Sequence, residues 1–343
     1  MDNGANDFCA VSSRIRLARN LKRYLFSVSA AGDRNRDIAA EIAAVLRTRY
    51  SPGSFRVCYM DEIDDLEEAL LTAKHVLSPN LKENRRTGAL VIFGGEDLSV
   101  MINEEDHLRE QCVSEGLSLD KAYREVKELD NVLSSRLDFA RDDRFGYITA
   151  CLTNFGTGMR ASVMLFLPAL ERAGRMPALI GEMRLNGMTV RGVLGEGSVP
   201  LGCLYQVSNE VTLGFSEDEI ISAVNFAAKK IIRLEIEERN YRMETEPLVV
   251  IDGCYRAYGV LSNCRLLDYD EFCGLFVGLS TGIYYGLFPW VKLKARELSA
   301  LLVSMRPALL AARTGVTDGA SLRRIRADAI RNILNSGRGD AEF

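Results

Sequence analysis

The chain of 343 residues carries a net charge of −4, and 47% of its residues are hydrophobic. This length can bury a sizeable core, arranged as one large domain and a smaller second one. The acidic balance excludes a general electrostatic attraction to nucleic acid or to an anionic membrane, so any phosphate site must be built locally.

The N-terminal residues lack the basic and apolar regions of a secretory signal. An uncharged run at 273–291 contains glycines and a proline, and it predicts buried helices and turns rather than a membrane span. The eight cysteines form no C-x-x-C pair, and the chain has only two histidines. We therefore expect a protein of the reducing cytoplasm, without a metal site or disulfides, that binds neither nucleic acid nor membranes directly.

The first predicted element is an extended segment that contains the sequence SSRIR at residues 12–16. Arg14 and Arg16 are two positions apart, so an extended chain places both on one face and Ile15 on the other. Two such guanidinium groups suit a polyphosphate, because each can donate in parallel to two oxygens. The alternative is a surface strand with basic residues on its solvent face.

Apolar spacing predicts amphipathic helices over 36–50 and 61–75, and strands over 55–60 and 89–93. The second helix must end before Pro79. From this pattern alone, His75 at the helix end is expected to cap or pack rather than to catalyse.

Three successive carboxylates, Glu104, Glu105 and Asp106, follow a predicted strand over 98–102. Adjacent anions repel one another, which costs stability unless a cation lies nearby, and Arg109 can supply part of that compensation. The alternative is a solvated acidic turn.

Residues 118–140 have the spacing of an amphipathic helix. Residues 146–164 predict a strand, a turn rich in glycine and threonine, and an apolar helix that carries residues 161–170. Such a turn can hold an anion at the start of a helix, where Arg160 lies. An arginine in this apolar setting is expected to pair with a ligand or a carboxylate.

A strand at 189–192 leads into a loop in which glycines flank Glu196, and such loops can close on a ligand. An exposed flexible glutamate is the alternative. Another strand is expected at 204–208, and a capping box at Ser216 predicts a long helix to about Tyr241.

The charged patch at 237–246 predicts a domain boundary, with a catalytic domain at 1–241 and a mostly helical domain at 242–343. The second domain is expected to begin with a strand at 248–251 and to end in helices. No internal repeat is present.

Isolated arginines and glutamates are the candidate functional residues. The chain has neither a phosphate-binding loop with lysine nor the motifs of the common protein-kinase fold. Arginines could instead neutralise the phosphates of a nucleoside triphosphate, and two glutamates could bind a planar guanidinium. The set comprises Arg14, Arg16, Arg109, Arg160, Arg191, Glu105 and Glu196.

Several blocks of the chain resemble the signature sequences of the phosphagen (guanidino) kinase family, and most closely its bacterial members that phosphorylate arginine in proteins. The resemblance covers nearly the whole chain, with the blocks in the family's order. The blocks read SSRIR at 12–16, NEEDHLR at 103–109, CLTN at 151–154, GTGMRASV at 156–163, RGVLGEG at 191–197 and YGVLSNCR at 258–265.

The resemblance implies an α+β fold, in which a large domain with an antiparallel sheet flanked by helices, similar to glutamine synthetase, precedes a smaller helical domain. It also implies catalytic roles for Glu105, Glu196 and Cys151. The residues that it implies for ATP binding are Ser12, Ser13, Arg14, Ile15, Arg16, His75, Arg109, Arg160, Ala161, Ser162, Val163, Met164, Arg191, Gly192, Val193, Leu194 and Gly195.

The implied mechanism is direct phosphoryl transfer from ATP with nucleotide-bound Mg²⁺. A guanidinium is protonated at neutral pH and is a poor nucleophile, so a carboxylate must orient it and accept its proton. Glu105 is the candidate base, Glu196 completes the clamp, and Cys151 acts by electrostatic positioning. The arginines stabilise the in-line transition state.

Three departures from the family pattern are visible. Leu152 stands where the family usually has proline, and Val199 stands where it usually has glutamate. In the C-terminal domain, LRRIRA at 322–327 replaces an R-D-x-x-R-A motif that senses phosphoarginine. An apolar residue cannot bind phosphate, and Arg323 repels the guanidinium that it should receive, so we expect weak or absent regulation through this site.

The resemblance predicts a protein arginine kinase that marks proteins for stress response and degradation. Its implied partners are protein substrates, an activator protein, a stress repressor, a Clp protease and a second copy of the chain. One alternative is a kinase for free arginine or another small guanidino compound. It is less favoured because small-molecule members have a helical domain before the first arginine block, whereas Arg14 lies near the N-terminus. The other alternative is an inactive module that binds phosphoarginine.

Overall fold

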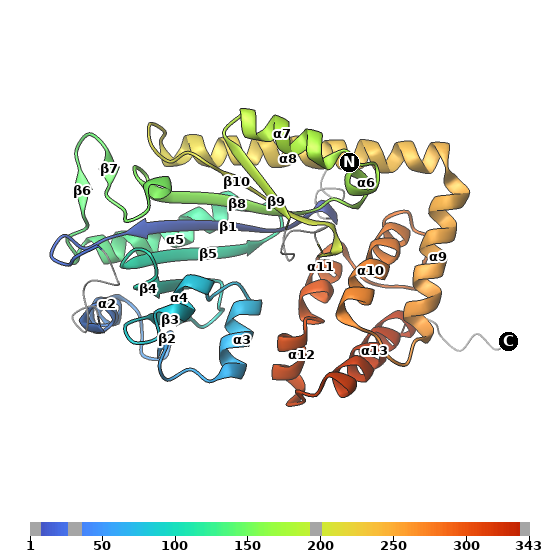
Figure 1. Cartoon of the computed structure of the whole chain (residues 1–343), viewed down its shortest axis with the longest axis horizontal. Helices are drawn as coiled ribbons and strands as arrows, with labels where there is room; N and C mark the ends of the chain where they lie inside the picture. The colour runs from blue at the N-terminus through green and yellow to red at the C-terminus, as the bar shows by residue number, and fades with distance from the viewer. Residues whose placement is uncertain (1–7, 27–35, 193–200, 337–343) are drawn as a thin grey trace.

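An antiparallel sheet of eight strands forms the centre of the molecule (Figure 1). The structure is a computed structural model that describes residues 8–26, 36–192 and 201–336. The strand order is β2-β3-β4-β5-β1-β8-β10-β9, which confirms the predicted α+β fold. The strands are β1 (Ala10–Arg19), β2 (Phe55–Tyr59), β3 (Ala89–Phe93), β4 (Leu98–Ile102), β5 (Leu108–Glu115), β8 (Met159–Phe166), β9 (Met188–Gly192) and β10 (Leu204–Asn209).

Strand β1 shows how the sequence sets the two faces of the sheet. Its side chains alternate, with Ile15 and Leu17 buried and Arg14 and Arg16 on the opposite, partly open face. The neighbouring strands β5 and β8 pair with β1 along most of its length. The sheet therefore has one apolar face and one face that carries arginines at its centre.

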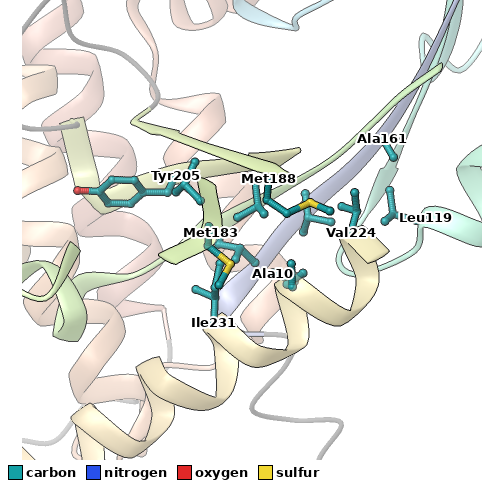
Figure 2. Close-up of a cluster of buried hydrophobic side chains, with 14 of the residues drawn as sticks. Ala10, Leu119, Ala161, Met183, Met188, Tyr205, Val224 and Ile231 are labelled. Atoms are coloured by element: carbon teal, nitrogen blue, oxygen red, sulfur yellow. The ribbon is translucent and has the colours of Figure 1, made fainter. Parts of the chain in front are cut away.

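Three helices cover the apolar face: α5 (Leu119–Ser134), α7 (Met176–Leu185) and α8 (Glu217–Thr245). Figure 2 shows Val224 and Ile231 of α8 in this core, with Met183 of α7 and Ala10 of β1. The predicted capping box at Ser216 is confirmed, because its hydroxyl accepts from the Glu219 amide and the Glu219 carboxylate accepts from the Ser216 amide. Helix α2 (Arg36–Arg49) extends the cover over β3 and β4.

The opposite face is covered only over one end of the sheet. Helices α3 (Asp65–Ala73) and α4 (Pro79–Glu83) pack on β3 and β4 through Leu71 and Leu81. The remaining strands, β5, β1, β8 and β10, keep part of this face open between these helices and the C-terminal helices.

The C-terminal helices form a second core around Phe272, Phe276 and Leu279. Phe166 of β8 and Leu204 of β10 belong to this core, which therefore joins the helices to the sheet. Figure 1 shows the long α8 leading to α9, with α12 lying near α3 across the open face. The helices are α9 (Pro247–Asn263), α10 (Tyr269–Tyr284), α11 (Ala295–Ser304), α12 (Pro307–Thr314) and α13 (Gly319–Asn335).

Short elements connect these parts. The hairpin of β6 (Arg141–Asp142) and β7 (Gly146–Tyr147) precedes the 3₁₀ turn η2 (Leu152–Asn154). Helix α6 (Pro168–Arg172) follows β8, and the 3₁₀ turn η3 (Leu201–Cys203) precedes β10.

Two predicted elements are wrong. Residues 161–166 lie in strand β8 rather than in a helix, because Ala161, Val163 and Leu165 alternate toward the core between β1 and β10. Residues 248–251 lie in helix α9 rather than in a strand. Pro247 at the first helical position favours a helix start, and only Val250 of the short apolar run is buried.

All eight cysteines are free. Within the described part of the chain, no helix is long and apolar enough to cross a membrane. The uncharged run at 273–291 divides between α10 and the turns that follow it.

A buried ion pair ties β1 to α5. The Arg19 side chain is fully buried, and its Nε donates to Asp130 Oδ1 at 2.8 Å. Its Nη1 donates to the carbonyl of Thr157 at 3.0 Å, and the guanidinium lies 3.6 Å from the centre of the Tyr147 ring. One side chain thus fixes β1, α5 and the segment before β8 relative to one another.

We expect Asp130→Ala to lower the free energy of unfolding by about 3–5 kcal/mol, because it removes the nearest carboxylate from the buried Arg19 guanidinium and leaves it with the longer contact to Glu217, at 3.7 Å. The control is Glu128→Ala on the same helix, which breaks the exposed pair between Arg49 and Glu128 at 3.2 Å. That loss should be about 0–1 kcal/mol. Urea unfolding of both variants measures the difference, and similar losses for the two would contradict this assignment.

Candidate active site

Five arginines meet on the open face of the sheet. Residues directly opposite in an antiparallel pair project to the same face. Arg16 lies opposite Arg160 of β8, and Arg109 of β5 lies opposite Ala18, two positions from Arg16. Arg14 shares this face, and Arg191 of β9 lies opposite Gln206 of β10. The strand register, rather than a loop, therefore assembles the basic cluster.

The cluster lines a cavity of about 390 Å³ together with Glu105 and Cys151. Arg14 Nη2 lies 3.5 Å from Gln206 Oε1, and Arg160 Nη2 donates to Ser208 Oγ at 3.1 Å. Arg160 Nε is buried and has no hydrogen-bond partner among the described residues. The cavity thus retains donor capacity for a ligand with several acceptor oxygens.

The positive charges in this cavity repel one another, which costs free energy. Burial, followed by the charges of Arg109 and Arg160, lowers the pKa of Arg14 to about 10. Burial and Arg160 likewise lower the pKa of Arg109 to about 10, and burial and Arg191 lower the pKa of Arg160. A polyanion would relieve this mutual repulsion, so the electrostatics favour a phosphate-rich ligand.

The three adjacent carboxylates have different environments. They lie in the tight turn between β4 and β5, where Asn103 has a φ of 57° and its amide donates to the His107 carbonyl. Glu104 is buried, pairs with Arg109 and accepts from Ser78 Oγ at 2.6 Å. Burial raises the pKa of Glu104.

Asp106 is also buried, and it lines the cavity while its carboxylate holds neighbouring segments in place. Its Oδ1 accepts from Asn20 Nδ2 and from the Ala150 amide, both at 2.6 Å. Glu105 is the exposed member of the three, and its Oε1 accepts from Asn80 Nδ2 of α4 at 2.9 Å. All three carboxylates line the cavity, but only Glu105 is exposed there, and its two neighbours hold the surrounding segments.

Cys151 is distant from the acidic turn in the sequence, but it lines the same cavity. Its Sγ is 3.0 Å from Thr153 Oγ1, and its carbonyl accepts from Thr149 Oγ1 at 2.8 Å. Asp106, through its bond to Ala150, anchors this segment to the acidic turn. The arrangement places a thiol and a carboxylate in one cavity with the basic cluster.

A second cavity, of about 620 Å³, continues along the same face toward the C-terminal helices. Its lining includes Ser12 and Met164, which lie opposite each other on β1 and β8, and His75 at the end of α3. Much of the remaining lining is apolar, from Leu70, Ala73, Val113, Ala300, Val303 and Leu309. This cavity suits a flat, largely apolar group next to the phosphate-rich ligand.

His75 connects this cavity to the C-terminal helices. Arg306, in the turn between α11 and α12, donates from Nη1 to the Ala73 carbonyl at 2.6 Å and lies 3.3 Å from His75 Nε2. Burial, then the charges of Arg306 and Arg14, lower the pKa of His75 to about 4. His75 is therefore neutral at physiological pH and accepts from Arg306.

The sequence-based set divides into four groups. The basic cluster, Glu105 and Cys151 share the first cavity, and Ser12, His75 and Met164 line the second. The side chains of Ser13, Ile15, Ala161 and Val163 lie on the buried side of the sheet, Ser162 is buried, and Gly192 is exposed at the end of β9. Val193, Leu194, Gly195 and Glu196 lie outside the described residues.

Sequence reasoning missed several residues that line the two cavities. Gln206 and Ser208 alternate with the buried Tyr205 and Val207 along β10, and this period of two could have identified them. Asn80 and Arg306 carry no such local signal.

Comparison with known proteins identifies the family. The family model described as ATP:guanido phosphotransferase, C-terminal catalytic domain, matches residues 37–238. The chain belongs to the ATP:guanido phosphotransferase family. It is accordingly a phosphotransferase, and the predicted family resemblance is confirmed.

Curated relatives of this ATP:guanido phosphotransferase cover most of its length. A protein-arginine kinase of Geobacillus stearothermophilus is 37% identical over 310 residues, which are 90% of this chain and 85% of the relative. A protein-arginine kinase of Bacillus cereus (strain G9842) is 37% identical over 341 residues, covering 97% and 94%.

Solved structures share the fold. The substrate-free duplicated taurocyamine kinase from Schistosoma mansoni has a TM-score of 0.60 and 24% identity, over 71% of this chain and 36% of that one. A lombricine kinase has a TM-score of 0.59 and 22% identity, over 67% of this chain and 66% of that one. The chain thus spans about a third of the duplicated enzyme and two thirds of the single one.

The low pKa of His75 predicts a pH dependence of stability. The unfolded chain binds more protons than the folded one between about pH 6.5 and 4, so the free energy of unfolding falls as the pH drops through this range. Between pH 7.5 and pH 5, the free energy of unfolding measured in urea should fall by about 2 kcal/mol less in His75→Gln than in the wild-type protein. An equal fall in both proteins would mean that His75 is not buried in its neutral form.

Proposed function

We propose that this phosphotransferase is an ATP-dependent protein arginine kinase, which transfers the γ-phosphoryl group to the guanidinium of arginine side chains. The observation that carries the proposal is one cavity in which five arginines face an exposed glutamate. The arginines match a polyphosphate and the glutamate matches a guanidinium. Relatives at 37% identity over most of the chain that are named protein-arginine kinases support the same acceptor.

In this proposal the two cavities hold different parts of the nucleotide. The phosphates contact the basic cluster, and the base enters the apolar cavity beside Ser12, His75 and Met164. No group of three or more metal-ligating side chains occurs among the described residues, so Mg²⁺ would arrive bound to the phosphates. The ion, when bound, neutralises charge on the phosphate oxygens.

The acceptor guanidinium would bind at Glu105. An arginine side chain stays protonated at neutral pH, so its nucleophilic nitrogen needs a carboxylate that orients it and takes its proton. Asn80 holds Glu105 at the cavity and leaves the rest of the carboxylate open. We propose Glu196 as the second carboxylate and Cys151 as a positioning group next to the acceptor.

The five arginines would act in the transition state. Phosphoryl transfer spreads negative charge over the equatorial oxygens, and fixed cations stabilise that charge without reorganisation. Gln206 and Ser208 restrain Arg14 and Arg160, which lowers the entropy that these long side chains lose on binding.

The second candidate is a kinase for free arginine or another small guanidino compound, since the same cavity accepts any guanidinium. Comparing turnover of free arginine with that of a folded arginine-rich protein separates the two. A strong preference for free arginine would reverse the order. Nucleotide binding without turnover, retested with a partner protein present, would instead favour an inactive phosphoarginine-binding module.

The division of the chain into two units, its location and its partners are also proposals. We propose a catalytic unit at 1–241 and a helical unit at 242–343, a boundary that falls in the last turns of α8. Free cysteines throughout the chain support a cytoplasmic location. An activator protein, a stress repressor, a Clp protease and a second copy of the chain are the proposed partners.

Glu105→Gln should lower kcat about 10²-fold or more, with little change in the KM for ATP, because the amide keeps the shape but cannot accept the proton. Arg160→Ala should raise the KM for ATP as well, because it removes a phosphate contact. Mass spectrometry for acid-labile phosphoarginine on a protein substrate with Mg-ATP measures both effects. Wild-type protein that forms no more phosphoarginine than Glu105→Gln would refute the proposed activity.

The altered motif at 322–327 predicts weak or absent regulation by phosphoarginine through α13. Leu322 is buried against Leu310, and Arg323 lies 3.7 Å from Asp268. Arg326 is buried and donates to the backbone carbonyls of Leu267 and Met305, so its donors stabilise the helical unit.

Kinase activity should therefore stay constant when free phosphoarginine is titrated in. A saturable activation that disappears in Arg326→Ala would show that the sensing site survives in altered form. Because Arg326 also stabilises the fold, thermal unfolding of this variant serves as the control.

A further inference from the structure

An exposed apolar surface borders the cavity that contains Glu105 and Cys151. It is formed by Phe145, Leu152, Leu213 and Phe215, which we call the apolar rim. Leu152 is 85% exposed and Phe215 is 53% exposed, so both present apolar area to solvent. Exposed apolar residues are common singly, whereas a group beside a binding cavity marks an interaction site.

Three chain segments build the rim, and hydrogen bonds hold them together. Thr212 Oγ1 donates to the carbonyls of Thr153 and Phe155, at 3.1 and 2.7 Å. The Tyr147 amide donates to the Gly156 carbonyl at 2.6 Å. The rim therefore consists of the β6–β7 hairpin, the segment around η2 and the segment before α8, in a fixed arrangement.

Close backbone approach supports this rigidity. Gly156 has a φ of 109°, and a Cβ atom there would lie 2.6 Å from the Thr212 carbonyl oxygen. The rings of Phe145 and Phe155 pack with centroids 6.1 Å apart. A preformed apolar surface loses little conformational entropy when a ligand binds.

Between the segments lies a hollow of about 430 Å³, whose walls include Phe145, Leu213 and Phe215. Charged residues of both signs also line it, namely Lys127, Arg141, Arg144, Asp143 and Glu217. Its volume suits a single side chain, and Phe145, Leu213 and Phe215 offer that side chain apolar contacts.

The rim is continuous with the cavity of the basic cluster. Cys151, Thr153 and Asn154 line that cavity, while Leu152, between them in sequence, is exposed. A free arginine bound at Glu105 has no atoms that extend onto the rim. A polypeptide has such atoms, because its chain continues on both sides of the acceptor arginine.

We propose that the apolar rim is a docking surface for the substrate polypeptide, which binds an apolar or aromatic side chain two or three residues from the acceptor arginine. This inference rests on the proposed protein arginine kinase activity and deepens it. The rim thus contributes to the choice among arginines in a protein substrate, whereas the basic cluster and Glu105 act on every guanidinium alike.

Peptides of equal length and charge, each with one arginine, test the proposal. One carries leucine two residues before the arginine, one carries leucine two residues after it, and one carries serine at both places. For the wild-type protein, kcat/KM should be about tenfold higher for one leucine peptide than for the serine peptide, through a lower KM.

The double variant Leu152→Ser with Phe215→Ser should lose this preference and keep its activity on the serine peptide within about twofold. Both residues are exposed, so the variant should fold. The matched control is Leu248→Ser, which removes a leucine that is 80% exposed on α9, on the far side of the molecule from the β6–β7 hairpin (Figure 1). The control should keep the preference.

The possible results are distinguishable. Equal phosphorylation of all three peptides by the wild-type protein, or a preference that persists in the double variant, would overturn the rim assignment and leave the kinase activity intact. Absence of phosphoarginine on every peptide and on folded protein would overturn the proposed function itself, and with it this inference.

Discussion

The alternation of side chains along antiparallel strands is the constraint on which the site depends. Because β1 lies between β5 and β8, residues at every second position of three strands share one face. The apolar half of the alternation buries Ile15 and Leu17 beneath helices, and the polar half collects Arg14, Arg16 and Arg160. The core and the phosphate site thus lie on opposite faces of the same strands. A shift of the strand register by one residue would exchange the two faces and destroy both.

Concentrating cations in this way destabilises the unliganded protein, and neighbouring groups limit the cost. Glu104 pairs with Arg109, while Gln206 and Ser208 hold two further arginines. The compensation is incomplete, since the pKa values of buried arginines remain lowered. The repulsion among these arginines is relieved only when an anion binds, so the fold itself favours anion binding.

The acidic turn shows how chemically similar neighbours acquire different tasks. Glu104 and Asp106 are buried and hydrogen-bonded, so they fix an arginine and the segment of Cys151. Glu105, between them, stays exposed at the cavity. Because Glu104 and Asp106 are fixed, Glu105 between them has a precise position. A carboxylate that must meet a guanidinium needs such a position. The apolar rim extends the same rigid frame toward the substrate.

The sequence by itself determined the shared face of Arg14 and Arg16 and the cap at Ser216, because these depend on local periodicity and capping. The order of its motifs determined the family, and the antiparallel α+β class followed from that resemblance. The sequence misassigned residues 161–166, because a short apolar run fits a buried strand or a helix equally well. Only the tertiary structure decided that Glu104 and Asp106 are buried while Glu105 is exposed, and that Arg306 contacts His75. Those two residues are 231 positions apart, and no local pattern encodes such a contact.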